Sequence, residues 1–265
     1  MEPAAKNAPE TNREVIAEFS QASQTLNASH EDQMTLVLDE YRSVVQTSGI
    51  GQLATAVDQP LHIPFLGKTL PTSPLSGEDF IRLACAYRQS RPNDSPSIYG
   101  YSEGKRHLRL EELLETFPIW SSDPTEGCHK VLSMLGGATI RLTDVHLMSR
   151  TAYAMRNAIL DATSSTGETH AFYSTPRCGT AVPYHRDSGI QVIYQVTGEK
   201  RWFFDGGTDK TLLLRPGDFL IIPLARLHRA ETEALYSIHL TVMLNPIAEL
   251  AIMEVLTRGF LGLEV

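Results

Sequence analysis

The second half of the chain is a series of short apolar or alternating runs separated by turn-forming residues. From His170 onward the runs are THAFYS, GIQVIYQV, KRWFF, TLLL, DFLIIP and YSIHLTVML, and the breaks are PRCGT, TGE, DGGTDK and RPGD. Each run is long enough for one strand, and each break carries residues that favour tight turns. Short strands at this spacing are typical of β-sandwiches and barrels. The second half therefore predicts an antiparallel double-sheet barrel.

The first half has a different periodicity. Apolar residues recur at threes and fours from Glu14 to about Leu26 and from Glu31 to about Val45, as on one face of a helix. Ser76 with Asp79 resembles a capping box before FIRLACAYRQ. Residues 91–105 have the composition of a loop, and LRLEELLETF that of a short helix. ATIRL predicts a strand and SRTAYAMRNAILDAT a helix. The expected fold class is α+β, with a mostly helical N-terminal region packed on the barrel.

These patterns suggest four segments. Residues 1–13 are polar and predict a disordered tail, and 14–135 form the helical, loop-rich region. The barrel, which we expect to be the catalytic domain, spans residues 136–246 in this division. Residues 247–265, with LAIMEVLTRGFL at helical spacing, predict a C-terminal helix that docks on the barrel or makes a homodimer contact.

Composition narrows the classes of partner. With 265 residues and 42% apolar content, the chain can bury a sizeable core. A net charge of −8 and the absence of any Lys/Arg run argue against a nucleic acid or an anionic membrane as partner. The three cysteines (Cys85, Cys128 and Cys178) fit neither a disulfide framework nor paired zinc ligands. No apolar run reaches membrane-spanning length, so we expect a cytoplasmic protein.

The stretch YHRDSG, at residues 184–189, has two interpretations. His-Arg-Asp opens the catalytic loop of protein kinases, but that loop requires an Asn five residues after the Asp and a later DFG. Here the fifth residue is Val192 and no DFG follows. The kinase interpretation therefore fails, which leaves a metal site as the alternative.

Residues two apart on a strand point to the same face, so His185 and Asp187 can direct an imidazole and a carboxylate at one point. His228, after the strand-and-turn stretch RPGDFLIIPLARL, is the best third ligand. Two His and one carboxylate on one side of an iron leave positions open for a co-substrate and O₂, as in non-haem Fe(II) oxygenases.

The spacing also resembles the two cupin motifs. Gly179 is followed after five residues by His185-x-Asp187, then by Gln191 and, six residues on, Gly198. Gly217 is followed by five residues, then Pro223-x-Ala225, two residues and His228. Asp187 replaces the second motif His, Gln191 replaces the motif Glu, and Ala225 replaces a turn Gly. The resemblance thus implies three protein ligands where four are usual.

This variant looks like the JmjC-type, cupin-like Fe(II)/2-oxoglutarate oxygenases. The stretch STPRCGTAVPYHRDSGIQVIYQVTGEKRWFF resembles the ribosomal oxygenases and their bacterial cupin-like relatives, and the likeness covers about residues 136–246. It implies a double-stranded β-helix (jelly-roll) barrel that binds Fe(II), 2-oxoglutarate and O₂. We expect no winged-helix domain after the barrel, so the ribosomal substrates of those proteins are not carried over.

The resemblance also implies residue roles. Iron would be held by His185, Asp187 and His228. Lys200 matches the basic residue that binds the distal carboxylate of 2-oxoglutarate; the alternative is a solvated charge on a turn. Tyr173 matches the family's strand Tyr, which hydrogen-bonds the same carboxylate, or else is a core aromatic. Gln191 shares strand parity with His185 and faces 2-oxoglutarate, a metal ligand or a core hydrogen-bond partner.

Other residues are candidates for the pocket or the substrate. Thr180 and Thr241 are pocket candidates, and His239 is a pocket-wall or core His more readily than a fourth ligand. Arg177, Tyr184 and Trp202 lie near the expected mouth. Arg186 points away from the metal and is interpreted as a surface residue.

The resulting hypothesis is a hydroxylase that uses Fe(II), 2-oxoglutarate and O₂. Its substrate would be a peptide or protein side chain, or an amino-acid-derived small molecule, and demethylation remains open because fold does not fix the substrate. The alternatives are a cupin metalloenzyme with chemistry independent of 2-oxoglutarate, favoured if Lys200 is exposed to solvent, and a non-catalytic cupin binding module.

Overall fold

The computed structural model describes residues 32, 34–54, 58–65, 75–77, 79–80, 83, 98–102, 105–107, 139–174, 182–206, 211–233 and 236–245. The predicted tail 1–13, the helices expected over 14–26 and 108–117, and the C-terminal helix 247–265 lie outside these residues.

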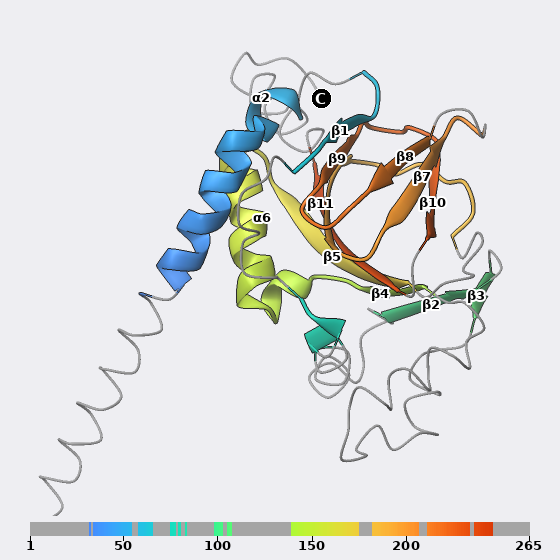
Figure 1. Cartoon of the computed structure of the whole chain (residues 1–265), viewed down its shortest axis with the longest axis horizontal. Helices are drawn as coiled ribbons and strands as arrows, with labels where there is room; N and C mark the ends of the chain where they lie inside the picture. The colour runs from blue at the N-terminus through green and yellow to red at the C-terminus, as the bar shows by residue number, and fades with distance from the viewer. Residues whose placement is uncertain are drawn as a thin grey trace, which may run out of the picture.

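Two antiparallel sheets form the body of the protein (Figure 1). The larger has the order β1-β9-β6-β11-β5-β4-β2-β3, and the smaller has the order β10-β7-β8. The strands are β1 (Leu61–Ile63), β2 (Ile98–Ser102), β3 (Lys105–His107), β4 (Thr139–Leu142), β5 (Gly167–Ser174), β6 (Ile190–Thr197), β7 (Lys200–Phe204), β8 (Thr211–Leu214), β9 (Phe219–Ile222), β10 (His228–Thr232) and β11 (Ser237–Leu244).

The chain alternates between the two sheets as it winds. It leaves the larger sheet after β6, makes β7 and β8 in the smaller, returns for β9, crosses for β10 and closes with β11 between β5 and β6. An isolated antiparallel bridge between His185 and His228 adds the segment before β6 to the β10 edge of the smaller sheet. This winding is the predicted double-stranded β-helix, and that prediction is confirmed.

A helical layer covers the outer face of the larger sheet (Figure 1). It contains a helix over residues 34–48, the short α2 (Ile50–Leu53) and α6 (Arg150–Thr163), which the one-turn η1 (Val145–Leu147) precedes. The Ser149 hydroxyl accepts a hydrogen bond from the Ala152 amide and so caps α6. The main hydrophobic core lies between this layer and the sheet. Among the described residues, no helix combines the length and apolar character needed to cross a bilayer.

The mostly helical character expected for residues 14–135 is not confirmed. In the described part of that region, β1 pairs with β9, and β2 pairs with both β3 and β4. β2 falls within the stretch 91–105, which was expected to be a loop, so that prediction is wrong there. The pairing with β4 provides hydrogen-bond partners for the backbone of β2, and composition alone does not reveal those partners. The Ser76–Asp79 capping box is confirmed, since the Asp79 amide donates to Ser76 Oγ at 3.0 Å and the Ser76 amide to Asp79 Oδ2 at 3.1 Å.

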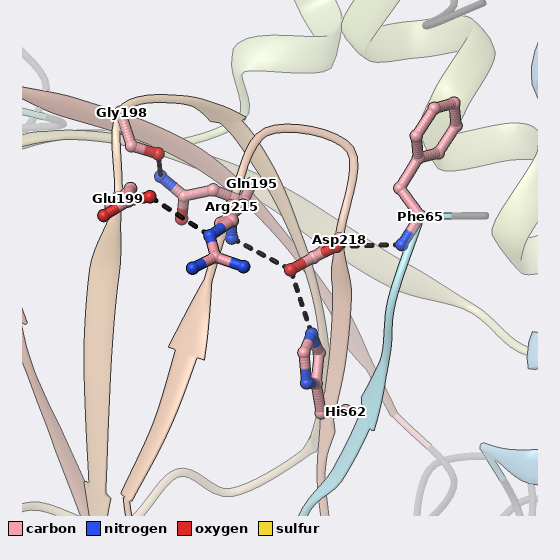
Figure 2. Close-up of polar contacts among 7 residues, drawn as sticks. All are labelled: His62, Phe65, Gln195, Gly198, Glu199, Arg215 and Asp218. Atoms are coloured by element: carbon pink, nitrogen blue, oxygen red, sulfur yellow. Dashed lines mark hydrogen bonds and ion pairs between the residues drawn. The ribbon is translucent and has the colours of Figure 1, made fainter. Parts of the chain in front are cut away.

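Asp218 fastens β1 to the barrel (Figure 2). Its carboxylate accepts hydrogen bonds from the Phe65 amide at 2.8 Å and the Arg215 amide at 2.9 Å. The His62 imidazole Nε2 lies 2.9 Å from the same carboxylate. Because β1 is a three-residue edge strand, these side-chain contacts add to the few backbone bonds that hold it.

Candidate metal centre and adjoining cavity

The two sheets enclose a cavity of about 150 Å³. One wall comes from β7 and β10 of the smaller sheet, and the other from β4, β5, β6 and β11 of the larger. The lining residues are Thr139, Arg141, His170, Phe172, Val182, His185, Asp187, Gln191, Ile193, Lys200, Trp202, His228, Ala230, His239, Thr241 and Met243. Most of them are polar, although many are buried, which is unusual for the interior of a barrel.

The backbone brings His185, Asp187 and His228 together at one end of this cavity. The amide of His185 donates to the carbonyl of His228, and the amide of His228 to the carbonyl of His185, each at 3.0 Å. Asp187 Oδ2 lies 3.3 Å from His228 Nε2 and 3.8 Å from His185 Nε2. The three ligand atoms are all within 4.8 Å of one another. Residues some 40 positions apart thus converge at a spacing that one metal ion can bridge.

Backbone carbonyls fix the orientation of both imidazoles. His185 Nδ1 lies 2.9 Å from the Pro183 carbonyl oxygen, and His228 Nδ1 lies 2.9 Å from that of Arg226. A carbonyl oxygen only accepts, so Nδ1 of each ring carries a proton. Nε2 of both rings is left to face the Asp187 carboxylate. This arrangement, with the second ring nitrogen held by the protein, is the usual one for metal-binding His.

The protonation states suit a divalent metal. Burial, followed by the nearby His228, lowers the pKa of His185 below its ordinary value. Burial alone would raise the pKa of Asp187, but the hydrogen bond and charge of His228, together with His185, outweigh it and lower that pKa. The site therefore offers a neutral imidazole at His185 and a carboxylate at Asp187. With His228, this donor set fits Fe(II).

The turn before His228 also supports the site. Ala225 adopts a left-handed conformation, with φ of 57°, where the cupin motif has Gly. Its amide donates to the Asp187 carbonyl at 3.1 Å, and its carbonyl accepts from the Arg186 guanidinium. Arg186 is exposed, and its guanidinium reaches outward to this turn.

Lys200 is buried beside the cavity, with 3% of its surface exposed. Its Nζ donates to Ser174 Oγ at 2.8 Å and lies 3.1 Å from His239 Nδ1. An ammonium group only donates, so His239 Nδ1 accepts and the His239 proton sits on Nε2. Burial and then the charge of Lys200 lower the pKa of His239 well below its ordinary value. Lys200 is therefore a fixed internal cation, and its alternative as a solvated turn residue is wrong.

Tyr173 packs in the main core, as its alternative role of a core aromatic requires, and its binding of the co-substrate stays a prediction. On β5 the side chains that line the cavity are His170 and Phe172, and Ser174 on the same face contacts Lys200. Tyr173 has the opposite parity and packs in the main core, with its ring 5.4 Å from that of Tyr236. Ser174 supplies a hydroxyl that contacts Lys200.

Four of the other candidates line the cavity: Gln191, Trp202, His239 and Thr241. The Gln191 amide donates to the Gly189 carbonyl at 3.3 Å. Tyr184 is absent from the cavity lining in the described structure, and its ring lies 5.2 Å from the Arg229 guanidinium carbon. Arg177 and Thr180 lie outside the described residues.

Several polar and aromatic residues of this region were not predicted. Thr139, Arg141, His170 and Phe172 line the cavity, and Ser174 contacts both Lys200 and the Thr139 hydroxyl oxygen, which lies 2.8 Å from its own. The polar residues of THAFYS gave a usable signal, because His170 and Ser174 share one parity whereas Ala171 and Tyr173 share the other. If the inner face of this strand is taken to be polar, this parity predicts that His170 and Ser174, and not Ala171 and Tyr173, face the cavity.

Searches against protein-family models and against curated proteins each gave no match. Among solved structures, the chain is similar to the Escherichia coli ribosomal oxygenase YcfD in complex with cobalt and succinic acid, at 17% identity and a TM-score of 0.48, over 70% of this chain and 48% of that one. YcfD with cobalt and 2-oxoglutarate matches at 16% identity and 0.46, over 78% and 55%. A cupin superfamily protein from Desulfitobacterium hafniense matches at 20% identity and 0.25, over 29% and 66%. The matched region spans about half the length of the ribosomal oxygenase.

Proposed function

We propose that the protein is a 2-oxoglutarate-dependent, non-haem Fe(II) oxygenase. The observation that carries the proposal is the convergence of His185, Asp187 and His228, with Nε2 of both rings beside the Asp187 carboxylate, in a cavity that also holds a buried Lys200. A metal site and an internal cation in one cavity suit a ligand that chelates metal at one end and carries a carboxylate at the other.

The chain's own residues would hold and orient the reactants. His185, Asp187 and His228 would bind the metal on one side. Lys200, kept in place by Ser174 and His239, would bind the distal carboxylate of 2-oxoglutarate. When bound, Fe(II) with 2-oxoglutarate and O₂ supplies hydroxylation of an unactivated C–H bond, in which one oxygen atom enters the substrate and the other enters succinate as CO₂ leaves. The enclosing sheets would exclude bulk water from the reactants.

The burial of Lys200 weighs against chemistry independent of 2-oxoglutarate. A protein interior accommodates an ammonium group only at a cost in free energy, which a bound carboxylate offsets. A binding module without catalysis would have no need of three ligand atoms at metal spacing, each oriented by a backbone hydrogen bond or a neighbouring ligand. For the substrate, the proposal includes a peptide or protein side chain, or an amino-acid-derived small molecule.

The test is to add Fe(II) and then 2-oxoglutarate to the protein without oxygen and to record the weak visible charge-transfer band of chelated 2-oxoglutarate. We expect the band in the natural protein and none in Asp187→Ala. Arg186→Ala is the matched control, because Arg186 lies between two ligands but points outward, and it should keep the band. If the natural protein and Asp187→Ala give identical spectra, the proposal is wrong. A band followed by oxygen-dependent succinate formation would support the full reaction.

A further inference from the structure

The cavity wall on the larger sheet carries side chains to which the proposed function assigns no role. Arg141 on β4 lies opposite Phe172 on β5 in the sheet register, and its guanidinium carbon is 5.8 Å from the Phe172 ring centroid. His170 is two residues from Phe172 on the same face of β5, and it pairs with Thr241 on β11. Arg141, His170, Phe172 and Thr241 all line the cavity, on the larger sheet. Lys200 belongs to the smaller sheet.

His170 is a buried polar group without a hydrogen bond to any described residue. Its exposed fraction is 4%, and within the described part of the chain neither ring nitrogen has a hydrogen-bond partner. Glu168 Oε2 is 3.5 Å from Nε2, but that carboxylate is half exposed and does not line the cavity in the described structure. Buried donors without partners are rare in folded proteins and often mark the place of a missing ligand. Burial and then Arg141 lower the pKa of His170 to about 3, so the neutral ring carries one N–H donor.

The charges of this wall favour an anion. Among the described lining residues, Lys200 and Arg141 are cations, and the one carboxylate is Asp187, a proposed metal ligand. Arg141 acts electrostatically on both His185 and Asp187, so it adjoins the metal centre. A guanidinium has five N–H donors and can hold a partner elsewhere in the chain while it offers others to a ligand. An entering ammonium or guanidinium group would meet two like charges here.

We propose that Arg141 and His170 form a substrate-recognition wall, and that the group it holds beside the metal centre is a carboxylate of the substrate. The inference rests on the proposed function and names its substrate class. The carboxylate belongs either to an acidic side chain of a peptide or to a small organic acid. Arg141 supplies a charged pair of donors, His170 supplies one N–H, and Phe172 packs along the adjoining carbon chain.

The test uses the protein loaded with Fe(II) and 2-oxoglutarate without oxygen, and calorimetry as the binding measurement. Two probes are acids: N-acetyl-aspartate N-methylamide represents an acidic side chain of a peptide, and N-acetylglycine represents a small organic acid. The corresponding asparagine and lysine derivatives are the neutral and cationic controls. We expect at least one acid to bind about tenfold or more tightly than the asparagine and lysine probes, because a charge-assisted pair of hydrogen bonds is lost with them. Whichever acid binds more tightly identifies the source of the carboxylate.

Variants separate recognition from a structural role. Arg141→Gln should remove the tenfold preference, Arg141→Lys should restore part of it, and His170→Phe should weaken binding of the acid. In a parallel titration of the charge-transfer band, Arg141→Gln should bind 2-oxoglutarate far more tightly than Lys200→Gln does.

Three results would overturn the inference: equal or tighter binding of the lysine probe, no binding of either acid, or equal loss of 2-oxoglutarate affinity in Arg141→Gln and Lys200→Gln. The last would make Arg141 a co-substrate anchor. Absence of the band in the natural protein would instead overturn the proposed function and this inference together, so the two failures are distinguishable.

Discussion

The two faces of the larger sheet are both buried but differ in polarity. On β11, Leu240 and Val242 point to the helical layer and are fully buried, whereas His239 and Thr241 point to the cavity with 4% and 5% of their surface exposed. β5 repeats the contrast, with Ala171 on the helix side and His170 on the cavity side. Adjacent residues therefore have similar burial and opposite chemistry.

This difference separates the residues that stabilise the fold from those that serve the site. The helix-side face buries apolar area, which drives folding. The cavity-side face buries polar groups, which contribute little net stability even when they are hydrogen-bonded. Polarity, rather than burial, therefore distinguishes the cavity face of the sheet from its core face.

The largest expected contrast comes from neighbouring substitutions on β11. Leu240→Ala should lower the free energy of unfolding by roughly 2–5 kcal/mol, because it leaves a cavity in the main core. Thr241→Val keeps the side-chain volume on the polar face and should change the free energy by less than about 1 kcal/mol. Urea denaturation of both variants measures the difference. Similar losses in the two would contradict the division between the faces.

A second contrast concerns Lys200. Lys200→Met keeps most of the side-chain volume but removes the cation, so we expect roughly 100-fold weaker 2-oxoglutarate binding, corresponding to the loss of a charge-assisted pair. The unfolding midpoint should move far less than in Leu240→Ala. The measurement is titration of the charge-transfer band without oxygen, with thermal unfolding as the control for folding. Unchanged co-substrate affinity would remove Lys200 from the site.

The polar face should also make the fold sensitive to acid. The pKa of His170 is about 3 in the folded protein and about 6.5 when unfolded, so below pH 6.5 the unfolded state binds the extra proton. Its contribution to stability is thus present above pH 6.5 and is lost as the pH falls toward 3. At pH 5 the loss is on the order of 2 kcal/mol. His170→Phe should flatten this part of the curve of unfolding free energy against pH, and an unchanged slope would contradict the assignment.

The smallest expected effect is at the rim of the site. Ala225→Gly should raise the free energy of unfolding by about 1 kcal/mol, because Gly adopts the left-handed conformation without the steric cost of a Cβ. Metal binding should be unchanged, since the Ala225 contacts to Asp187 and Arg186 use the backbone. Chemical denaturation detects the change. A loss of stability would show that the Ala225 methyl group contributes packing that outweighs the strain.

The sequence predicted the barrel well because its signals are local. Strand and turn periodicity identified most strands of the second half, and the spacing of His185, Asp187 and His228 picked out three side chains that the structure brings together. The prediction failed where long-range pairing decides. Ile98–Ser102 became a strand because β4 lies beside it, a partner that local composition does not reveal.

Tyr173 illustrates, within one strand, that the environment of a side chain depends on pairing with other strands. A shift of one residue exchanges the two faces of a strand, and the likeness of a motif cannot resolve it without the register. Pairing of β5 with β4 and β11 placed Tyr173 in the main core and Ser174 beside Lys200.

By itself the sequence determined the kind of fold, through alternating short strands, and a set of candidate metal ligands, through their spacing. Only the tertiary structure decided which side chains share the cavity. Lys200 comes from β7 of the smaller sheet, whereas its partners Ser174 and His239, like Arg141 and His170, come from strands of the larger sheet. The physical reason is that strand order and register are set by backbone pairing across the whole barrel, and these contacts join residues far apart in the chain.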